Sequence, residues 1–449
     1  MTRKCTDLTL TPAPDETIEG AAADLRAGKV TSVELVERCL ARIDRWEIDV
    51  QAWVIVDRDG VRKQAEQCDR ERKSGNDRGA LHGIPIGIKD IIDVAGFPTA
   101  AGSKARANTI VKQDAPVVAR LRAAGAVILG KTVTTQFASF DPPPTRNPWN
   151  FDRTPGGSSS GSAAAVAVGM CLGALGSQTG GSITRPASYC GVMGCKPSYG
   201  RVTLEGIVPL APSLDHPGPM AKSVRGMAIL LDAISQDGSE FPSLVAATES
   251  SRKNAPRIGR LHGLFDALAD SEVRSATDRS IAQLVAADAE VRDASLPEAF
   301  QDVIRRHRTM MAVEVATDHE ERLAKMPDDY LPNVRSLIEE GLKSTPTEYV
   351  RSRKLQTQLR HEIESTFDGY DVLACPATTS PAPDVATTGD PAFNSPWSYL
   401  GLPTVCLPIA LSSDGLPLGL QLVARTGDET TLFAAAHWCE SVLIRDLSR

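Results

Sequence analysis

Two glycine–serine segments hold the hydroxyl groups of this sequence that are best placed for chemistry. The first, PGGSSSGSAAA, spans residues 155–165, and the second, GSQTGGSITRP, spans residues 176–186. Between them we expect a helix over 160–170, about 16 Å long at about 1.5 Å per residue. A strand of about five residues, rising about 3.3 Å each, then returns a similar distance. Ser158 and Ser182 are therefore expected to meet at one point.

A serine that attacks a carbonyl group needs oxyanion donors and a base. The glycines ahead of Ser182 leave consecutive backbone N–H groups free to face a ligand, as an oxyanion site requires. Neither segment contains histidine, but lysine acts as a base when burial lowers its pKa. Lys89 ends the apolar run GIPIGIK, and lowering its pKa by about three units costs about 4 kcal/mol. An ion pair of Lys89 with Asp90 or Asp93 is an equally good interpretation.

Two other motifs match known patterns in their letters but not in their context. GAVILGKT, residues 125–132, fits the phosphate-loop pattern G-x-x-x-x-G-K-[ST]. Its variable positions, Ala-Val-Ile-Leu, predict a buried strand that Lys131 ends, so we do not expect nucleotide binding. Gly157, Ser159 and Gly161 fit G-x-S-x-G, but the preceding NPWNFDRTPG holds two prolines and predicts no strand. A nucleophile elbow needs that strand, so Ser159 is not expected to attack the substrate.

The charge pattern argues against several classes of partner. The 449 residues carry a formal net charge of −7, which gives no reason to expect nucleic acid or an anionic membrane as partner. One basic run, IRRHR at 304–308, is interpreted as a solvated helix face. Residues 154–184 contain no charged side chain, but their Ala, Gly, Ser and Thr content predicts buried interior rather than a membrane span.

The nine cysteines are scattered along the chain and form no C-x-x-C pair. We interpret them as reduced, buried thiols of a cytoplasmic protein. The N-terminal stretch MTRKCTDLTL lacks the apolar core of a signal peptide, which agrees with that location. The seven histidines are equally dispersed, so the sequence predicts neither a metal site nor a cofactor.

The order of the elements predicts an α/β protein. Helical patterns fill an N-terminal region over 1–75, in which TSVE is a capping box. Strands and helices alternate over 76–225, which is typical of a mixed or parallel sheet covered by helices. Residues 226–370 are charged and largely helical, and we expect them to form an insertion or cap. Apolar strands return over 371–449 and complete the core.

Four segments of the sequence resemble hallmark segments of the amidase signature family. They are GIPIGIKDIIDVAG, RNPWNFDRTPGGSSSGSAAAVAVG, TGGSITRPASYCGVMGCKPSYGRV and GLPLGLQLVARTGDE, and the resemblance spans roughly residues 15–440. The resemblance implies the family's fold, a single large mixed β-sheet core with helices on both faces. It also implies the family's Ser–cisSer–Lys triad. By position, Ser182 would be the nucleophile, Ser158 the serine after a cis peptide bond with Gly157, and Lys89 the base.

The neighbouring residues have supporting roles under the same resemblance. Ser159 would support the hydrogen-bond network, and Ser160 would begin a helix. Backbone N–H groups of four consecutive residues would form the oxyanion hole: Thr179, Gly180, Gly181 and Ser182.

Two positions depart from the commonest form of the family. Gln178 stands where Asp is common, and Thr184 stands where Arg is common, with Arg185 one position later. Both positions lie beside the oxyanion loop, so an ion pair of the relatives is expected to be absent here. Gln178 is a candidate substrate contact, and Trp397 and Tyr399 are candidate walls of the substrate pocket. For the two aromatic residues, packing is an equally good interpretation.

The resemblance implies a serine amidohydrolase that cleaves the C–N bond of a small amide, anilide or carbamate through an acyl-enzyme. One alternative is the ammonia-releasing component of a glutamine-dependent amidotransferase, which supplies ammonia in a tRNA-charging complex. A second is a hydrolase acting mainly on urethanes, carbamates or esters. A catalytically dead binding module is a third, although the lysine and both serines argue against it. We expect a small-molecule substrate, no nucleic acid or membrane partner, and a monomer or homodimer.

Overall fold

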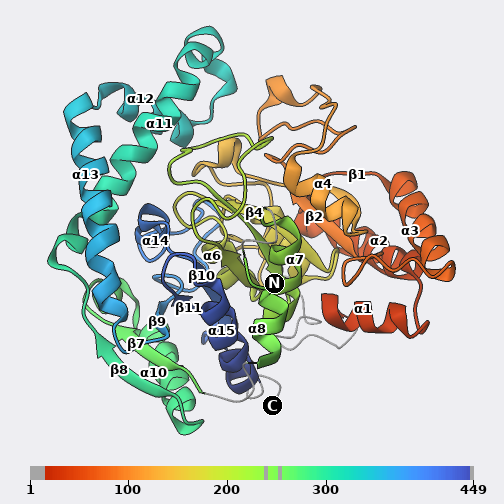
Figure 1. Ribbon diagram of the computed structural model, residues 1–449. Coiled ribbons are helices and arrows are strands. Elements are labelled where there is room, and N and C mark those ends of the chain that lie inside the picture. The colour runs from red at the N-terminus through yellow and green to blue at the C-terminus, as the bar shows by residue number, and fades with distance from the viewer. Residues whose placement is uncertain (1–15, 237–240, 251–254, 445–449) are drawn as a thin grey trace.

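The computed structural model describes residues 16–236, 241–250 and 255–444, so the N-terminal stretch MTRKCTDLTL with Cys5 lies outside the described residues. Within these ranges eleven strands form one sheet in the order β1-β3-β2-β4-β6-β5-β10-β11-β9-β7-β8 (Figure 1). The strands are β1 (Trp53–Val56), β2 (Pro85–Lys89), β3 (Val127–Thr132), β4 (Gly173–Gln178), β5 (Met193–Lys196), β6 (His216–Ala221), β7 (Arg257–Leu261), β8 (Glu290–Ala294), β9 (Val372–Pro376), β10 (Thr404–Leu411) and β11 (Pro417–Val423).

The sheet is mixed, and its parallel part carries the lysine and one serine segment. Strand β2 pairs in parallel with both β3 and β4, with Ile88 opposite Leu175 of β4. Strands β4, β6, β5, β10, β11 and β9 then pair antiparallel in that order. Because β2 and β4 are parallel neighbours, their carboxyl ends lie at the same edge of the sheet, where ligands bind in α/β proteins.

Helices cover both faces of the sheet, as the sequence predicted. Neighbouring residues of one strand enter different apolar clusters, because successive side chains of a strand point to opposite faces. On β4, Leu175 belongs to one cluster and Ala174 to the other. The first face is covered by α1 (Ile18–Arg26), α4 (Pro116–Ala123), α7 (Val224–Ile234), α10 (Ser271–Ala286) and α15 (Glu429–Leu443). The second is covered by α2 (Ser32–Val50), α3 (Arg58–Lys73), α5 (Ser160–Ala167) and α6 (Thr184–Cys190).

Three long helices come from the region in which an insertion or cap was expected. They are α11 (Val303–Lys325), α12 (Pro332–Lys343) and α13 (Pro346–Glu362), and they lie on the opposite side of the molecule from α2 and α3 (Figure 1). Helix α11 packs against both of the others and against α14 (Ser395–Leu400). The same region also contributes β7 and β8 to the end of the sheet. The short helices α8 (Leu244–Ser250) and α9 (Leu264–Leu268) complete it.

Most local predictions agree with the structure, with three differences. The capping box at Thr31 is present, and β3 replaces the phosphate loop that the letters of 125–132 suggested. The predicted helix over 160–170 ends earlier, at Ala167. Strand β1 interrupts the N-terminal helices, and Lys131 lies buried inside β3 rather than at an exposed end. None of the helices within the described ranges combines the length and apolar character that crossing a membrane requires.

Candidate active site

Lys89 lies at the carboxyl end of β2 and is fully buried, with 0% of its surface exposed. Its Nζ is 2.7 Å from Oγ of Ser158 and 2.8 Å from Oγ of Ser177, and 3.4 Å from the Ser177 carbonyl oxygen. Burial holds the pKa of Lys89 well below its ordinary value of 10.5, and the Asp215 carboxylate opposes that shift only in part. A lysine in this setting is a base at neutral pH.

The alternative ion pairing of Lys89 is not what the structure contains. Asp90 pairs instead with the buried Lys131 of β3, at 2.9 Å. The Nζ of Lys131 also donates to the carbonyl oxygen of Pro98 at 2.9 Å. The hydrogen-bond partners of Lys89 within the described residues are two hydroxyl groups and a carbonyl, so its amine has no carboxylate in direct contact.

The three consecutive serines have three different roles. Ser158 follows a cis peptide bond with Gly157, where the resemblance implied one, and its Oγ contacts Lys89. Ser159 donates through Oγ to the carbonyl of Ser177 at 3.1 Å and accepts the N–H of Ser177 at 3.2 Å. Ser160 is the first residue of α5, as expected. The cluster therefore joins the start of α5 to the end of β4.

Ser182 lies between β4 and α6 and is 6% exposed. Its carbonyl accepts the backbone N–H of Ser159 at 3.3 Å. Ser159 thus contacts both glycine–serine segments, and its neighbour Ser158 contacts the lysine. The structure brings all three sequence segments together at the carboxyl ends of β2 and β4.

Sequence reasoning missed Ser177, which contacts Lys89 through both its Oγ and its carbonyl oxygen. The available signal was its place near the end of β4, in parallel pairing with the strand that Lys89 ends. It also missed His307. The run IRRHR at 304–308 was expected to be a solvated face, which is correct for Arg305 and Arg308 but wrong for His307. That histidine is 2% exposed and donates to the carbonyl of Thr179.

Both departures from the common family pattern have neutral partners. The Oε1 of Gln178 accepts the N–H groups of Ile183 and Thr184, each at 2.9 Å. Arg185 is 1% exposed and donates through Nη2 to the carbonyl of Gly157 at 2.8 Å. It also donates to the backbone carbonyl and the hydroxyl oxygen of Thr388. The first turn of α6 is therefore fixed by an amide, and a buried guanidinium holds the carbonyl ahead of Ser158.

Trp397 and Tyr399 of α14 lie in the apolar core. The Trp397 ring stacks on Phe265, with centroids 6.0 Å apart, and lies 5.6 Å from Phe300. The Tyr399 hydroxyl donates to the carbonyl of Ser352. These contacts favour packing, the second of the two interpretations of this pair.

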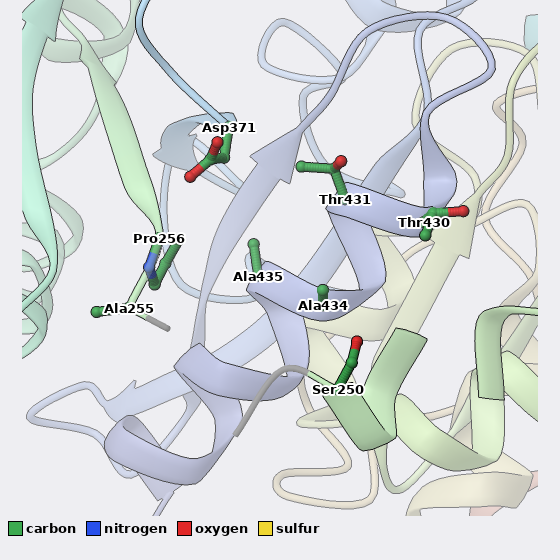
Figure 2. Close-up of a pocket in the computed structure, with 8 residues that line it drawn as sticks. All are labelled: Ser250, Ala255, Pro256, Asp371, Thr430, Thr431, Ala434 and Ala435. Carbon is green, nitrogen blue, oxygen red and sulfur yellow. The ribbon is translucent and has the colours of Figure 1, made fainter. Parts of the chain in front are cut away.

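A separate pocket of about 260 Å³ lies beside α15 and α8, away from the lysine and the serines (Figure 2). Thr430, Thr431, Ala434 and Ala435 line one side of it. Its one acidic group, Asp371, is paired with Arg257 at 2.6 Å. The pocket therefore offers no unpaired charge to a ligand, and none of the groups described above lines it.

Similarity to known proteins places this geometry in a family. A family model described as Amidase matches residues 34–433. The chain belongs to the amidase family. Among curated amidase-family relatives, a glutamyl-tRNA(Gln) amidotransferase chain of Roseiflexus sp. (strain RS-1) is 38% identical, over 93% of this chain and 94% of that protein.

Solved structures of other members agree with that assignment. A crystal structure of an amidase matches with a TM-score of 0.87 and 34% identity, covering 95% of this chain and all of that one. The peptide amidase from Stenotrophomonas maltophilia matches with a TM-score of 0.83 and 28% identity, covering 95% and 96%. The family and these neighbours identify this amidase as a hydrolase of amide C–N bonds.

Proposed function

We propose that this amidase is a serine amidohydrolase in which Ser182 is the nucleophile, Ser158 relays a proton and Lys89 is the base. The observation that carries the proposal is the 2.7 Å contact between the Lys89 amine and the Ser158 hydroxyl, fully buried and without a carboxylate in direct contact. A buried neutral amine next to a hydroxyl is the arrangement that activates a serine when no histidine is present.

The proposed reaction begins when neutral Lys89 takes the proton of Ser158 and Ser158 takes that of Ser182. The Ser182 oxygen bonds to the substrate carbonyl carbon, and the carbonyl electron pair moves to its oxygen. Backbone N–H groups of 179–182 stabilise that oxyanion. Collapse of the intermediate breaks the C–N bond, and the proton returns along the relay to the leaving amine. Water then attacks the acyl-enzyme, giving a carboxylic acid and free Ser182.

The two neutral interactions beside the loop support this use of its N–H groups. Gln178 occupies the N–H groups of Ile183 and Thr184, so those two donors are taken and the donors left for an oxyanion precede them. We propose a small amide, anilide or carbamate as substrate, since all three present a carbonyl group bonded to nitrogen. Esters share the acylation chemistry, so a panel of these four classes separates the preferences.

A second candidate is the ammonia-releasing component of a glutamine-dependent amidotransferase, in which the same triad releases ammonia from glutamine. The 38% identity to the Roseiflexus amidotransferase chain favours it, because the match covers nearly the whole of both chains. The two candidates differ in what the pure chain does alone. A free-standing hydrolase turns over simple amides without ATP or other proteins, and an amidotransferase component needs its partners to use glutamine.

Three serine variants test the proposal. We expect Ser182→Ala and Ser158→Ala to abolish amide hydrolysis and keep the thermal melting temperature within a few degrees. Ser160→Ala is the matched control, because it removes a hydroxyl from the same cluster that bonds only the Gly156 carbonyl. A fluorophosphonate should label Ser182 in the wild type and in Ser160→Ala. Full activity of Ser182→Ala would rule the mechanism out.

A further inference from the structure

Thr179, the first residue of the proposed oxyanion loop, is held from two sides. The His307 Nε2 donates to the Thr179 carbonyl oxygen at 2.8 Å, and the Thr179 hydroxyl donates to the carboxylate of Asp215. A carbonyl oxygen only accepts, so the proton of His307 resides on Nε2. Burial lowers the pKa of His307 to about 4, and the ring is therefore neutral near neutral pH.

Helix α11 also supports the second anchor of the loop. The Asp215 carboxylate accepts the N–H groups of Leu210 at 2.9 Å and Ala211 at 3.1 Å, which closes a turn around it. In the same turn, the N–H of Ser213 donates to Glu314 at 2.9 Å. Glu314 lies on α11, two turns beyond the histidine. One helix of the 226–370 region thus contacts both the loop and the turn that binds its threonine.

The contact with His307 fixes the direction of a neighbouring donor. The Thr179 carbonyl and the Gly180 N–H belong to one planar trans peptide unit, so they point in opposite directions. An oxygen held toward His307 therefore keeps the Gly180 N–H pointing away from that ring. The ring also bounds the loop on this side, since a Cβ placed on Gly180 would lie 3.6 Å from its Cε1.

We propose that His307 is a positioning residue of the amidase reaction, whose hydrogen bond to the Thr179 carbonyl orients the Gly180 N–H toward the oxyanion. The assignment of residues 179–182 as the oxyanion loop rests on the proposed function. His307 acts through the peptide group rather than on the reacting atoms. The helical region 226–370 thereby contributes to catalysis through α11.

Variants at this position separate the hydrogen bond from general packing. His307→Leu and His307→Met remove the donor, and His307→Gln keeps a side-chain N–H at a similar reach. Val315→Ala is the matched control, because it loosens a buried position of the same helix without touching the loop. For an aryl ester and an anilide, we expect Leu and Met at 307 to lower kcat about 10- to 100-fold with KM within about threefold.

The remaining outcomes are equally specific. His307→Gln should retain at least about a third of wild-type kcat, and Val315→Ala should lower the melting temperature without lowering kcat. A trifluoromethyl ketone, which becomes an oxyanion when serine adds to it, should bind the Leu variant about 10- to 100-fold more weakly. His307→Met replaces the Leu variant where that variant does not fold.

Two results would overturn the inference. One is a kcat of the Leu and Met variants equal to that of the wild type. The other is an equal loss of kcat in Val315→Ala at the same loss of melting temperature. Failure of the proposed function looks different, because the wild type itself would then show no fluorophosphonate label on Ser182.

Discussion

A methyl group added at Gly181 should displace the oxyanion loop by a distance that the structure defines. A Cβ on Gly181 would lie 2.6 Å from Oδ1 of Asn394 and 2.7 Å from Nη1 of Arg185. Neither neighbour is free to move, because Asn394 donates to the Ala377 carbonyl at 2.9 Å and Arg185 to the Gly157 carbonyl at 2.8 Å. Ordinary contact begins near 3.4 Å, so the loop must shift by about 0.8 Å.

A shift of that size is large for catalysis. A misplacement of about 1 Å costs on the order of 10²-fold in rate, which corresponds to about 2.7 kcal/mol of transition-state stabilisation. Overpacking the core also lowers the free energy of unfolding by about 1–3 kcal/mol. We therefore expect Gly181→Ala to lose about 100-fold in kcat for an anilide and to unfold at lower urea concentration.

Gly180→Ala is the matched control for stability. Its Cβ would meet nothing closer than 3.6 Å, the distance to His307 and Ser395, so its free energy of unfolding should equal that of the wild type. Urea melts of both variants and steady-state kinetics of Gly181→Ala test the reasoning. A Gly181→Ala enzyme with kcat within threefold of the wild type would refute the rigid packing of the loop from which the magnitude was worked.

Three further substitutions have expected outcomes. Gln178→Ala leaves two buried N–H groups of the loop after Ser182 unpaired, and urea melts should show a loss of about 2–4 kcal/mol. Asp90→Asn leaves Lys131 buried without its partner, so about 3–5 kcal/mol should be lost at neutral pH and less at higher pH, where the amine loses its proton. Trp397→Ala should lower the free energy of unfolding by about 3–5 kcal/mol, with KM unchanged if the ring packs the core; a large KM change with full stability would restore the pocket interpretation.

The lysine and the serine segments were predictable because their signals are local. Glycines mark the loops, an apolar run marks β2, and helix and strand lengths place Ser158 close to Ser182. Ser177 carried no such signal, because a serine inside a strand looks like any other small residue. Its role depends on the parallel pairing of β2 and β4, which the sequence did not specify.

His307 and β1 were missed for different physical reasons. The arginines at 305 and 308 are exposed and ion-paired, and they dominated the interpretation of the run, although residue 307 faces inward on the same helix. Strand β1 has four residues and a single pairing, with β3, so its pattern was too short to separate from the flanking helices. The burial of Trp397 depends on Phe265 and Phe300, which are distant in the sequence.

The rate of Ser182 labelling by a fluorophosphonate, followed against pH by mass spectrometry, tests the base and the nucleophile together. Activity requires the neutral amine of Lys89, and burial lowers its pKa. The labelling rate should therefore rise with pH and reach its plateau well below 10.5. Lys89→Met should lose that pH dependence together with most of the rate. Labelling of a different residue, or an unchanged rate and pH profile in Lys89→Met, would contradict the account.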